Sequence, residues 1–219
     1  MADQGDTAVI VFARAPVPGA SKTRLIPALG ATGAAALHGA MIERTLQTLA
    51  ALPHAYDLQL WCAPDTQHPL FARLAQPHRT SLHRQCGDDL GARMYHALNA
   101  ALHDHAQAII VGTDCPGLLQ TDIETAQEAL RHGADAVIGP AADGGYWLLG
   151  LRNVSPGLFA DIAWGGDTVY ADTVARLASL DWRWRALRTL ADVDRPEDLV
   201  HVPADWLADT LLEDTRENT

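Results

Sequence analysis

Cysteine, positive charge and long apolar runs are all scarce in this sequence of 219 residues. Its three cysteines, Cys62, Cys86 and Cys115, show no CxxC or Cys/His spacing, so neither a disulfide framework nor a structural zinc site is indicated. Acidic residues outnumber basic ones 27 to 16, and the resulting net charge of −11 argues against non-specific attraction to nucleic acid. No apolar run approaches the roughly 18 residues of a membrane span, and the acidic N-terminal segment MADQGDT does not resemble a signal peptide. We therefore expect a cytoplasmic protein with neither a membrane nor a nucleic-acid partner.

Several familiar catalytic signatures are missing as well. The segment GASKTR has neither the GxxxxGK[ST] spacing of a P-loop nor the GxGxxG spacing of a dinucleotide-binding loop. No GxSxG elbow is present, and no HxxxH pair encloses a glutamate. Six histidines fall in polar stretches, where we expect surface positions: His54, His68, His78, His83, His103 and His105.

Apolar runs alternate with amphipathic stretches along the chain, which is typical of α/β proteins. Strands are predicted at 7–12, 58–63, 108–112, 134–139 and 146–151, and helices at 31–52, 88–103, 121–131 and 169–180. This order predicts a doubly wound, mostly parallel sheet whose ligand loops follow the carboxyl ends of the strands. Residues 182–190 alternate apolar and basic side chains like an edge strand. We expect one domain over residues 1–219. Residues 152–219 would form an appended lobe on the side where a second substrate, the acceptor, would bind.

The loop after the first strand is the first candidate binding segment. It carries Arg14, Gly19, Lys22 and Arg24 within about a dozen residues, together with several backbone amides. Clustered amides and cations suit a phosphate group. A proline- and glycine-rich turn with solvated basic side chains is the alternative.

Asp114 directly follows a predicted strand, in the segment GTDCP. A carboxylate at the carboxyl edge of a parallel sheet can hold Mg²⁺ or Mn²⁺ against a diphosphate, and Thr113 could orient it by hydrogen bonding. The alternative is that Asp114 caps the turn that follows.

A third segment places Asp143 before Gly144, Gly145 and Tyr146. Glycines allow close approach of the backbone to a ligand, and Asp143 could bind an acceptor hydroxyl or act as a base. A tight hairpin turn would use the same residues.

The segment ADVDRPEDL near the C-terminus offers Asp192 and Asp194 before a helix that starts with proline. Asp194 could fold back as a second metal ligand. As the alternative, it caps that helix.

Six segments in chain order, spanning about residues 7–200, closely resemble the DUF2064 family of bacterial proteins, which are described as glycosyltransferase-like. These segments are FARAPVPGASKTRL, DDLGARM, VGTDCPGL, GPAADGGYWLLGL, WGGDTV and DVDRPEDL. The wider relatives of that family are GT-A-fold enzymes, including guanylyltransferases of the molybdenum cofactor and sugar-acid cytidylyltransferases. The resemblance implies a GT-A-like, three-layer α/β/α fold that binds a nucleotide diphosphate and Mg²⁺ or Mn²⁺.

The resemblance also implies roles for residues at matching positions. Lys22 and Arg24 correspond to the basic loop that neutralises phosphate charge, while Asp114 and Asp194 correspond to metal ligands. The chain departs from typical relatives in three places. It lacks a GGxGxR core in the first loop, has a single acid in GTDCP where many glycosyltransferases have DxD, and has WGGDTV, with Trp164, in place of a WSTDTV-like segment.

The favoured function is a metal-dependent glycosyltransferase with a nucleotide-sugar donor and a small-molecule acceptor. Asp143 would be its general base, and Lys22 would stabilise the leaving diphosphate. Gly144, Gly145, Tyr146 and Trp164 are assigned to the acceptor side. The alternatives are a nucleotidyltransferase that transfers a guanylyl or cytidylyl group from a nucleoside triphosphate to a phosphorylated small molecule with release of pyrophosphate, or a non-catalytic nucleotide-binding protein. The sequence leaves the base, the sugar, the acceptor and the oligomeric state open.

Overall fold

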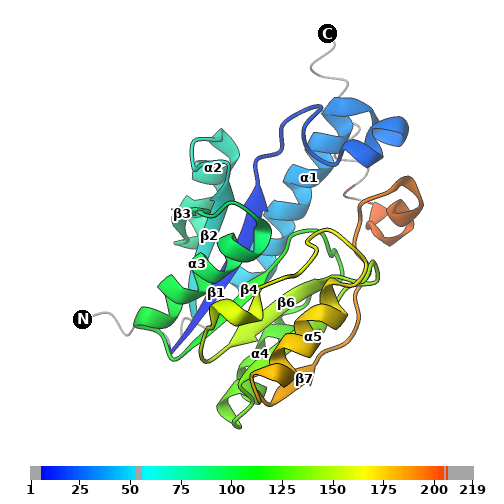
Figure 1. Ribbon diagram of the computed structural model, residues 1–219. Helices are drawn as coiled ribbons and strands as arrows, with labels where there is room; N and C mark the ends of the chain where they lie inside the picture. Colours follow the sequence, from blue (N-terminus) through cyan, green and yellow to red (C-terminus); the bar gives the residue numbers. More distant parts are fainter. Residues whose placement is uncertain (1–5, 53–55, 205, 207–219) are drawn as a thin grey trace.

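The computed structural model describes residues 6–52, 56–204 and 206, and its centre is a seven-stranded sheet within these residues (Figure 1). The strand order is β3-β2-β1-β4-β6-β5-β7, and β6 runs antiparallel to both β4 and β5 while the other pairs are parallel. The strands are β1 (Thr7–Arg14), β2 (Tyr56–Ala63), β3 (Ser81–Arg84), β4 (Gln107–Val111), β5 (Ala136–Pro140), β6 (Tyr146–Leu151) and β7 (Trp184–Ala186). The predicted mostly parallel sheet is confirmed.

Helices cover both faces of the sheet. One face carries α1 (Ile26–Ala50), α2 (Pro69–His78) and α4 (Gln120–Arg131), and the other carries α3 (Leu90–Asp104) and α5 (Val169–Ser179). Short 3-10 turns complete the chain at η1 (Thr23–Leu25), η2 (Pro156–Leu158) and η3 (Pro196–His201). The three-layer α/β/α architecture is therefore confirmed.

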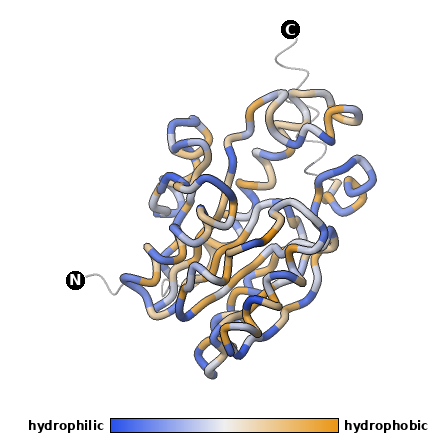
Figure 2. Tube along the Cα trace, viewed as in Figure 1, coloured by the Kyte–Doolittle hydropathy of each residue, from blue (hydrophilic) through white to orange (hydrophobic). Residues whose placement is uncertain are grey.

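The alternation of side chains along β1 shows how one strand serves two cores. Val9 and Val11 pack into the α1, α2 and α4 layer, whereas Ala8 and Ile10 pack into the α3 and α5 layer. All four side chains are buried, as expected for a central parallel strand covered on both faces. The central strands are accordingly the most hydrophobic part of the trace (Figure 2).

A third, smaller apolar cluster joins the start of α1 to the C-terminal segment. Leu25, Leu37 and Met41 pack against Val193 and Val202, and all five are buried. This contact brings the segment that contains Asp194 beside the loop after β1, although the two are some 170 residues apart in sequence.

The sequence prediction missed α2 and β3. Helix α2 has a proline at its start and Pro77 inside it, and β3 is a four-residue edge strand with polar side chains, so neither gives a strong periodic signal. Helix α1 begins at Ile26 rather than near residue 31, because a non-helical Gly30 with φ 70° joins two helical pieces. The edge strand expected within residues 182–190 is confirmed as β7, which is confined to three residues.

The sequence prediction also overlooked one apolar run. The helical segment Thr23–Ala50 is long and apolar enough to cross a membrane by length and composition alone. In the structure its apolar stripe, which includes Ile42, Leu46 and Leu49, packs against the sheet. The core helix of a globular domain meets the same criterion.

Candidate functional site

A cavity of about 640 Å³ lies where the segments singled out in the sequence converge. The loop after β1 forms one wall, Asp114 after β4 lies at its floor, and the β5–β6 turn and the segment before α5 close the other side. Its size is ordinary for a small-molecule site. The position, at the carboxyl ends of the parallel strands, is where α/β sheets place ligands.

The loop after β1 is fixed by Ser21, whose side chain is 2% exposed. The Ser21 hydroxyl donates to the carbonyl of Ala15 (2.8 Å) and accepts from the amide of Val17 (2.9 Å). This pair of bonds folds residues 15–21 into a compact turn, and Lys22 follows in a left-handed conformation with φ 46°. A lysine in that conformation costs about 1–3 kcal/mol unless the surroundings enforce it, which is common at functional sites.

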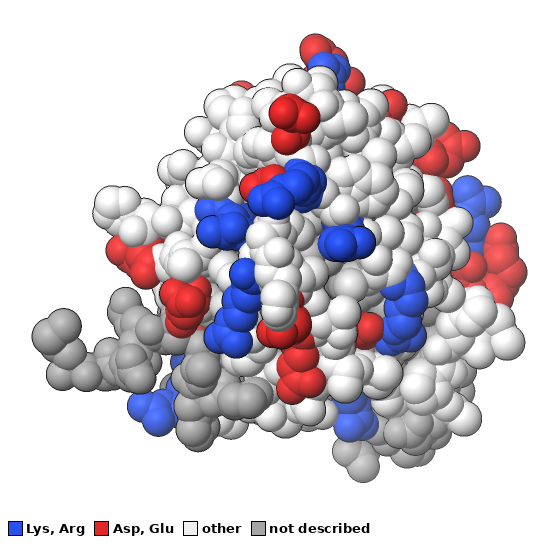
Figure 3. All heavy atoms as spheres, turned by 90° about the horizontal axis from the view of Figure 1, so that it is seen from below, with Lys and Arg blue, Asp and Glu red and all other residues white. Residues whose placement is uncertain are grey.

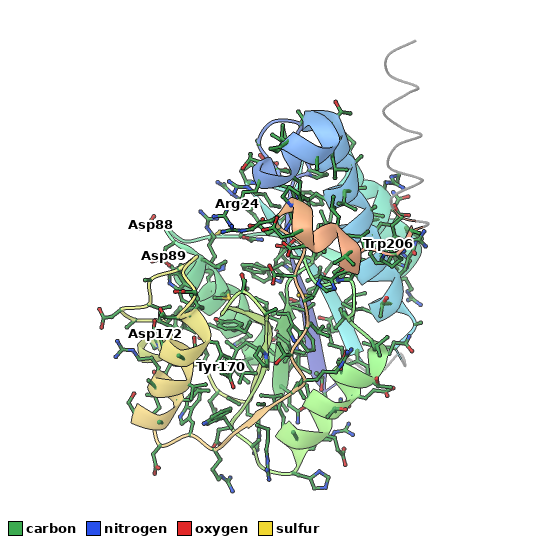
Figure 4. All side chains as sticks on the ribbon, turned by 90° about the vertical axis from the view of Figure 1, so that its right-hand side faces the viewer. Arg24, Asp88, Asp89, Tyr170, Asp172 and Trp206 are labelled. Atoms are coloured by element: carbon green, nitrogen blue, oxygen red, sulfur yellow. The ribbon has the colours of Figure 1, made fainter. Side chains whose placement is uncertain are left out.

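Lys22 lies between the two aspartates that were predicted to bind metal. Its Nζ is 2.9 Å from Asp114 Oδ1 and 3.7 Å from Asp194 Oδ1, and its side chain is only 5% exposed. Arg24 pairs with the second oxygen of Asp194 and points from the end of η1 toward η3 (Figure 4). The structure thus brings together four predicted residues from three distant segments.

These contacts argue against the capping alternative for the two aspartates. Asp194 does not cap η3, because Asp198 takes that role by accepting from the amides of Asp194 (3.0 Å) and Arg195 (2.7 Å). The carboxylate of Asp114 likewise faces Lys22, and its carbonyl accepts from the amide of Val193 (2.8 Å). Both side chains therefore remain directed at the cavity.

The opposite side of the cavity is acidic. Asp143 Oδ1 accepts from the amide of Gly145 (2.8 Å), so the residue also shapes the hairpin turn between β5 and β6. Burial, and next the charge of Asp143, raise the pKa of the half-buried Asp192 above its usual value. A second cavity of about 490 Å³ adjoins this side, and its lining adds Asp167 and Asp198 together with Arg24 and Arg195. Among the described residues, no cation lies within salt-bridge distance of Asp143, Asp167 or Asp192.

Two glycines let the acidic side close against its neighbours. Gly144 has φ 92°, and a Cβ there would lie 2.0 Å from the carbonyl oxygen of Asp167. A Cβ on Gly91, at the start of α3, would lie 2.5 Å from the ring of Trp164. Trp164 therefore packs flat against α3 and holds the segment 164–167 over the cavity.

The predicted site residues fall into two groups. Those that line the cavity are Arg14, Lys22, Arg24, Thr113, Asp114, Asp143, Gly145, Tyr146, Trp164 and Asp194. Gly19 and Gly144 lie outside the lining and shape the turns behind it, both with positive φ. Thr113 is buried, but its hydroxyl makes no hydrogen bond to Asp114 or to any other described residue. Burial raises the pKa of the Tyr146 phenol, which lies near Met94 Sδ (3.7 Å).

His38 is the cavity residue that sequence reasoning missed. It lies on the buried stripe of α1 between Ala34 and Ile42, is 6% exposed, and lines the cavity beside Lys22. Burial lowers its pKa to about 4. Its position among apolar residues at helical spacing was the sequence signal that could have identified it as a buried histidine.

The expectation of surface positions for the other histidines holds in part. His103 is exposed and His54 lies outside the described residues. His105 is buried, which makes that prediction wrong, because its ring Nδ1 lies 3.0 Å from the carbonyl of Ala101 and the ring closes the end of α3.

Arg188 braces the floor of the cavity from behind. Its guanidinium makes two bonds to the carboxylate of Asp122 (2.8 and 2.7 Å) and one to the carbonyl of Gly117 (2.7 Å). The Asp122 side chain is 9% exposed and also accepts from the amide of Leu119. This links the loop that carries Asp114 to the segment that leads to Asp194.

The rest of the surface offers less chemistry. A larger open groove, of about 1320 Å³ between α4 and β7, shares no lining residue with the cavity described above. The face of the molecule seen from below carries basic side chains interspersed with acidic ones, without a patch of one sign (Figure 3).

The donor set around Lys22 suits a hard divalent cation in combination with a substrate. Two carboxylates are present, and no cluster of three or more acidic, histidine or cysteine ligands is found in the described part of the chain. Mg²⁺ is commonly held by one or two carboxylates with phosphate oxygens and water completing its shell. The ammonium of Lys22 neutralises the same two carboxylates in the structure. If a divalent cation were bound, the cation and Lys22 would share the neutralisation of their charge.

Comparison with known proteins bears on the fold and the family. Residues 45–166 match the family model "Uncharacterized protein conserved in bacteria (DUF2064)". A candidate nucleotide-diphospho-sugar transferase from Desulfovibrio desulfuricans G20 has 30% sequence identity and a TM-score of 0.84, over 97% of this chain and 96% of that one. No curated protein matches the chain.

More distant structures share the fold. CMP:2-keto-3-deoxy-manno-octonic acid synthetase complexed with CTP has a TM-score of 0.58 at 12% identity, over 95% of this chain and 100% of that one. Glucosyl-3-phosphoglycerate synthase from Mycobacterium tuberculosis, complexed with Mn²⁺ and UDP, has a TM-score of 0.56 at 12% identity, over 95% of this chain and 79% of that one. These likenesses confirm the GT-A-like fold.

Proposed function

The chain belongs to the DUF2064 family, and from that premise we propose that it is a metal-dependent glycosyltransferase that takes a nucleotide-sugar donor and an uncharged, hydroxyl-bearing small-molecule acceptor. The names of its structural relatives support a transferase that handles nucleotides. A cytoplasmic location remains part of the proposal.

The observation that carries the proposal is the separation of charge across the cavity. The wall formed by the loop after β1 supplies Arg14, Lys22 and Arg24, which suits a diphosphate. The far side presents Asp143 and Asp192, with Asp167 beyond them in an adjoining cavity that Arg24 and Arg195 also line. A phosphorylated acceptor would meet like charge there, whereas a hydroxyl would meet a hydrogen-bond acceptor and a base. This arrangement favours glycosyl transfer over nucleotidyl transfer to a phosphate.

On the donor side, the protein's task is to neutralise a leaving nucleoside diphosphate. Lys22 is held in place by Ser21 and by the buried contacts of its loop, so its ammonium is positioned before the substrate arrives. Such preorganised charge stabilises a transition state in which negative charge builds on the leaving oxygen. A divalent cation bound by Asp114 and Asp194 would add Lewis-acid stabilisation of that oxygen.

On the acceptor side, Asp143 is the candidate general base. It would accept the proton of the acceptor hydroxyl as that oxygen attacks the anomeric carbon and the bond to the diphosphate breaks. Its carboxylate is held by the amide of Gly145, which leaves one oxygen uncommitted to the backbone. Trp164 and Tyr146 would enclose the sugar and the acceptor.

The test has two stages. Thermal-shift screening of nucleotide sugars, nucleoside diphosphates and nucleoside triphosphates, each with and without Mn²⁺ or Mg²⁺, would identify the donor class, since ligands of the native state raise its apparent stability. Product analysis with the best donor would then follow. Release of nucleoside diphosphate from a nucleotide sugar supports the proposal. Release of pyrophosphate from a triphosphate would establish the nucleotidyltransferase instead, and the absence of any shift would point to neither activity.

A further inference from the structure

His38 carries one of two buried side-chain nitrogens without a hydrogen-bond partner in the described part of the chain, the other being Nε2 of His105. Its Nδ1 is sealed from solvent and makes no hydrogen bond, and no other bond to the ring is formed within the described part of the chain. Unpartnered buried groups are rare in native proteins because each costs about 1–3 kcal/mol. A residue that carries this cost on the wall of a cavity calls for an explanation.

Since Nδ1 is closed to solvent, a ligand in the cavity would reach the other ring nitrogen, Nε2, and the surroundings of the ring indicate what Nε2 could bind. Arg14, Lys22 and Asp114 are the charged groups that act on His38, and all three line the same cavity. The two cations belong to the loop with the composition of a phosphate-binding segment. A ligand group that enters between them and His38 would be an anion with hydrogen-bond acceptors, and at neutral pH the uncharged imidazole has one N–H to donate.

We propose that His38 is a binding residue for the diphosphate of the nucleotide donor, donating a hydrogen bond to a phosphate oxygen once the cavity is filled. This inference rests on the proposed function, because it takes its ligand from that function. Because Nδ1 is sealed from solvent, Nε2 is the nitrogen that would donate to the phosphate oxygen, and the unpartnered Nδ1 is the cost of keeping a histidine at this position.

The substitution His38→Leu separates a binding role from a structural one. Leucine removes the unpartnered polar group and keeps an apolar side chain on the buried stripe of α1. The ligand-free protein should therefore melt at the same temperature or up to about 6 °C higher. Affinity for the diphosphate should fall about tenfold to a hundredfold, since a hydrogen bond to a charged group is lost. His38→Gln, which retains a donor, should recover part of the affinity and serves if the leucine variant does not fold.

His105→Leu provides a matched control. His105 is also a buried histidine, and its Nε2 is likewise without a hydrogen bond, but it lies at the junction of α3 and β4, outside the cavity lining. This variant should bind the diphosphate as the wild type does, whatever happens to its melting temperature.

The measurement is calorimetric titration of inorganic pyrophosphate and of UDP, GDP, CDP and ADP, each with and without Mg²⁺ or Mn²⁺, with melting temperatures of the ligand-free proteins. Weakened binding in His38→Leu, with unchanged or raised stability and with normal binding in His105→Leu, supports the inference. Equal affinity in wild type and His38→Leu would overturn the inference but leave the proposed function standing. Failure of the wild type to bind any of these diphosphates would overturn both.

Discussion

The two sides of the cavity are built on opposite principles. On the basic side, Lys22 and Arg24 are already paired with Asp114 and Asp194, and the loop is pinned by Ser21. On the acidic side, Asp143, Asp167 and Asp192 form no salt bridge within the described part of the chain, although Arg24 and Arg195 line the same adjoining cavity. Burial, and next the charge of Asp143, raise the pKa of Asp192. In the proposed function the first side would bind an anion, and the second, whose three aspartates form no salt bridge, would bind groups that donate hydrogen bonds.

Asp114→Asn tests the basic side and should have the largest effect. The change keeps the shape of the side chain but removes the charge that faces Lys22 and that would hold the proposed divalent cation. We expect a loss of about 10³-fold or more in kcat, since several kcal/mol of leaving-group stabilisation disappear. Steady-state kinetics with the donor identified by screening would measure it.

Asp161→Asn is the control for that substitution. Asp161 pairs with Arg176 (3.2 Å) and lies outside the lining of either cavity, so its amide variant should keep wild-type turnover. Equal activity of Asp114→Asn and Asp161→Asn would mean that the cavity is not the site of the reaction.

Asp143→Asn tests the acidic side. Loss of the proposed base should lower kcat by about 10²-fold while donor affinity remains unchanged, because the proposed donor site is on the opposite wall. Turnover and donor binding measured in parallel separate the two effects. A normal kcat in this variant would show that Asp143 is not the base. It would then favour nucleotidyl transfer to an acceptor phosphate, which needs no base.

Arg188→Met tests the brace that the two sides share. The substitution leaves the carboxylate of Asp122 buried and unpaired, which should cost about 2 kcal/mol, equivalent to about 4–8 °C in Tm. Thermal unfolding would measure it, with the exposed Arg185→Met as control. The double variant Asp122→Asn with Arg188→Met should lose less than the sum of the single changes, since no buried charge remains unpaired. Additive losses would show that the contact carries no coupling.

The segments that form the two sides of the cavity could each be predicted from the sequence, but their contacts with one another could not. Asp114 was predictable because a carboxylate after an apolar strand lies at a known edge of a parallel sheet. The placement of Lys22 between Asp114 and Asp194 was not, because it depends on the apolar cluster of Leu25 with Val193, across about 170 residues of chain. Local patterns report periodicity and turn chemistry, and they carry no information on such pairings.

The same reasoning explains the two misses closest to the site. His38 was overlooked because a lone histidine on an apolar helical stripe gives no sign of whether its partner is protein or ligand. Arg188 was overlooked because its partner, Asp122, is 66 positions away and looks like an ordinary first-turn acid of a helix. Helix α2 and strand β3 were missed because their hydrophobic periodicity is weak. Neither element lines the cavity.

The smallest expected effect concerns the floor between the two sides. Cys115 follows Asp114 in that floor, and burial, reinforced by the negative charge of Asp114, raises the pKa of its thiol; burial likewise raises the pKa of Cys62 to about 12. Thiol reagents attack the thiolate, so both should stay unmodified in the native protein at pH 8, and the exposed Cys86 alone should react. Intact-mass spectrometry should show one label per native chain, none in Cys86→Ser, and three in denaturant. Rapid labelling of Cys115 would show that solvent reaches this part of the cavity wall in the native protein. A wall that opens in this way could not keep the basic and acidic sides at a fixed separation, which their opposite roles require.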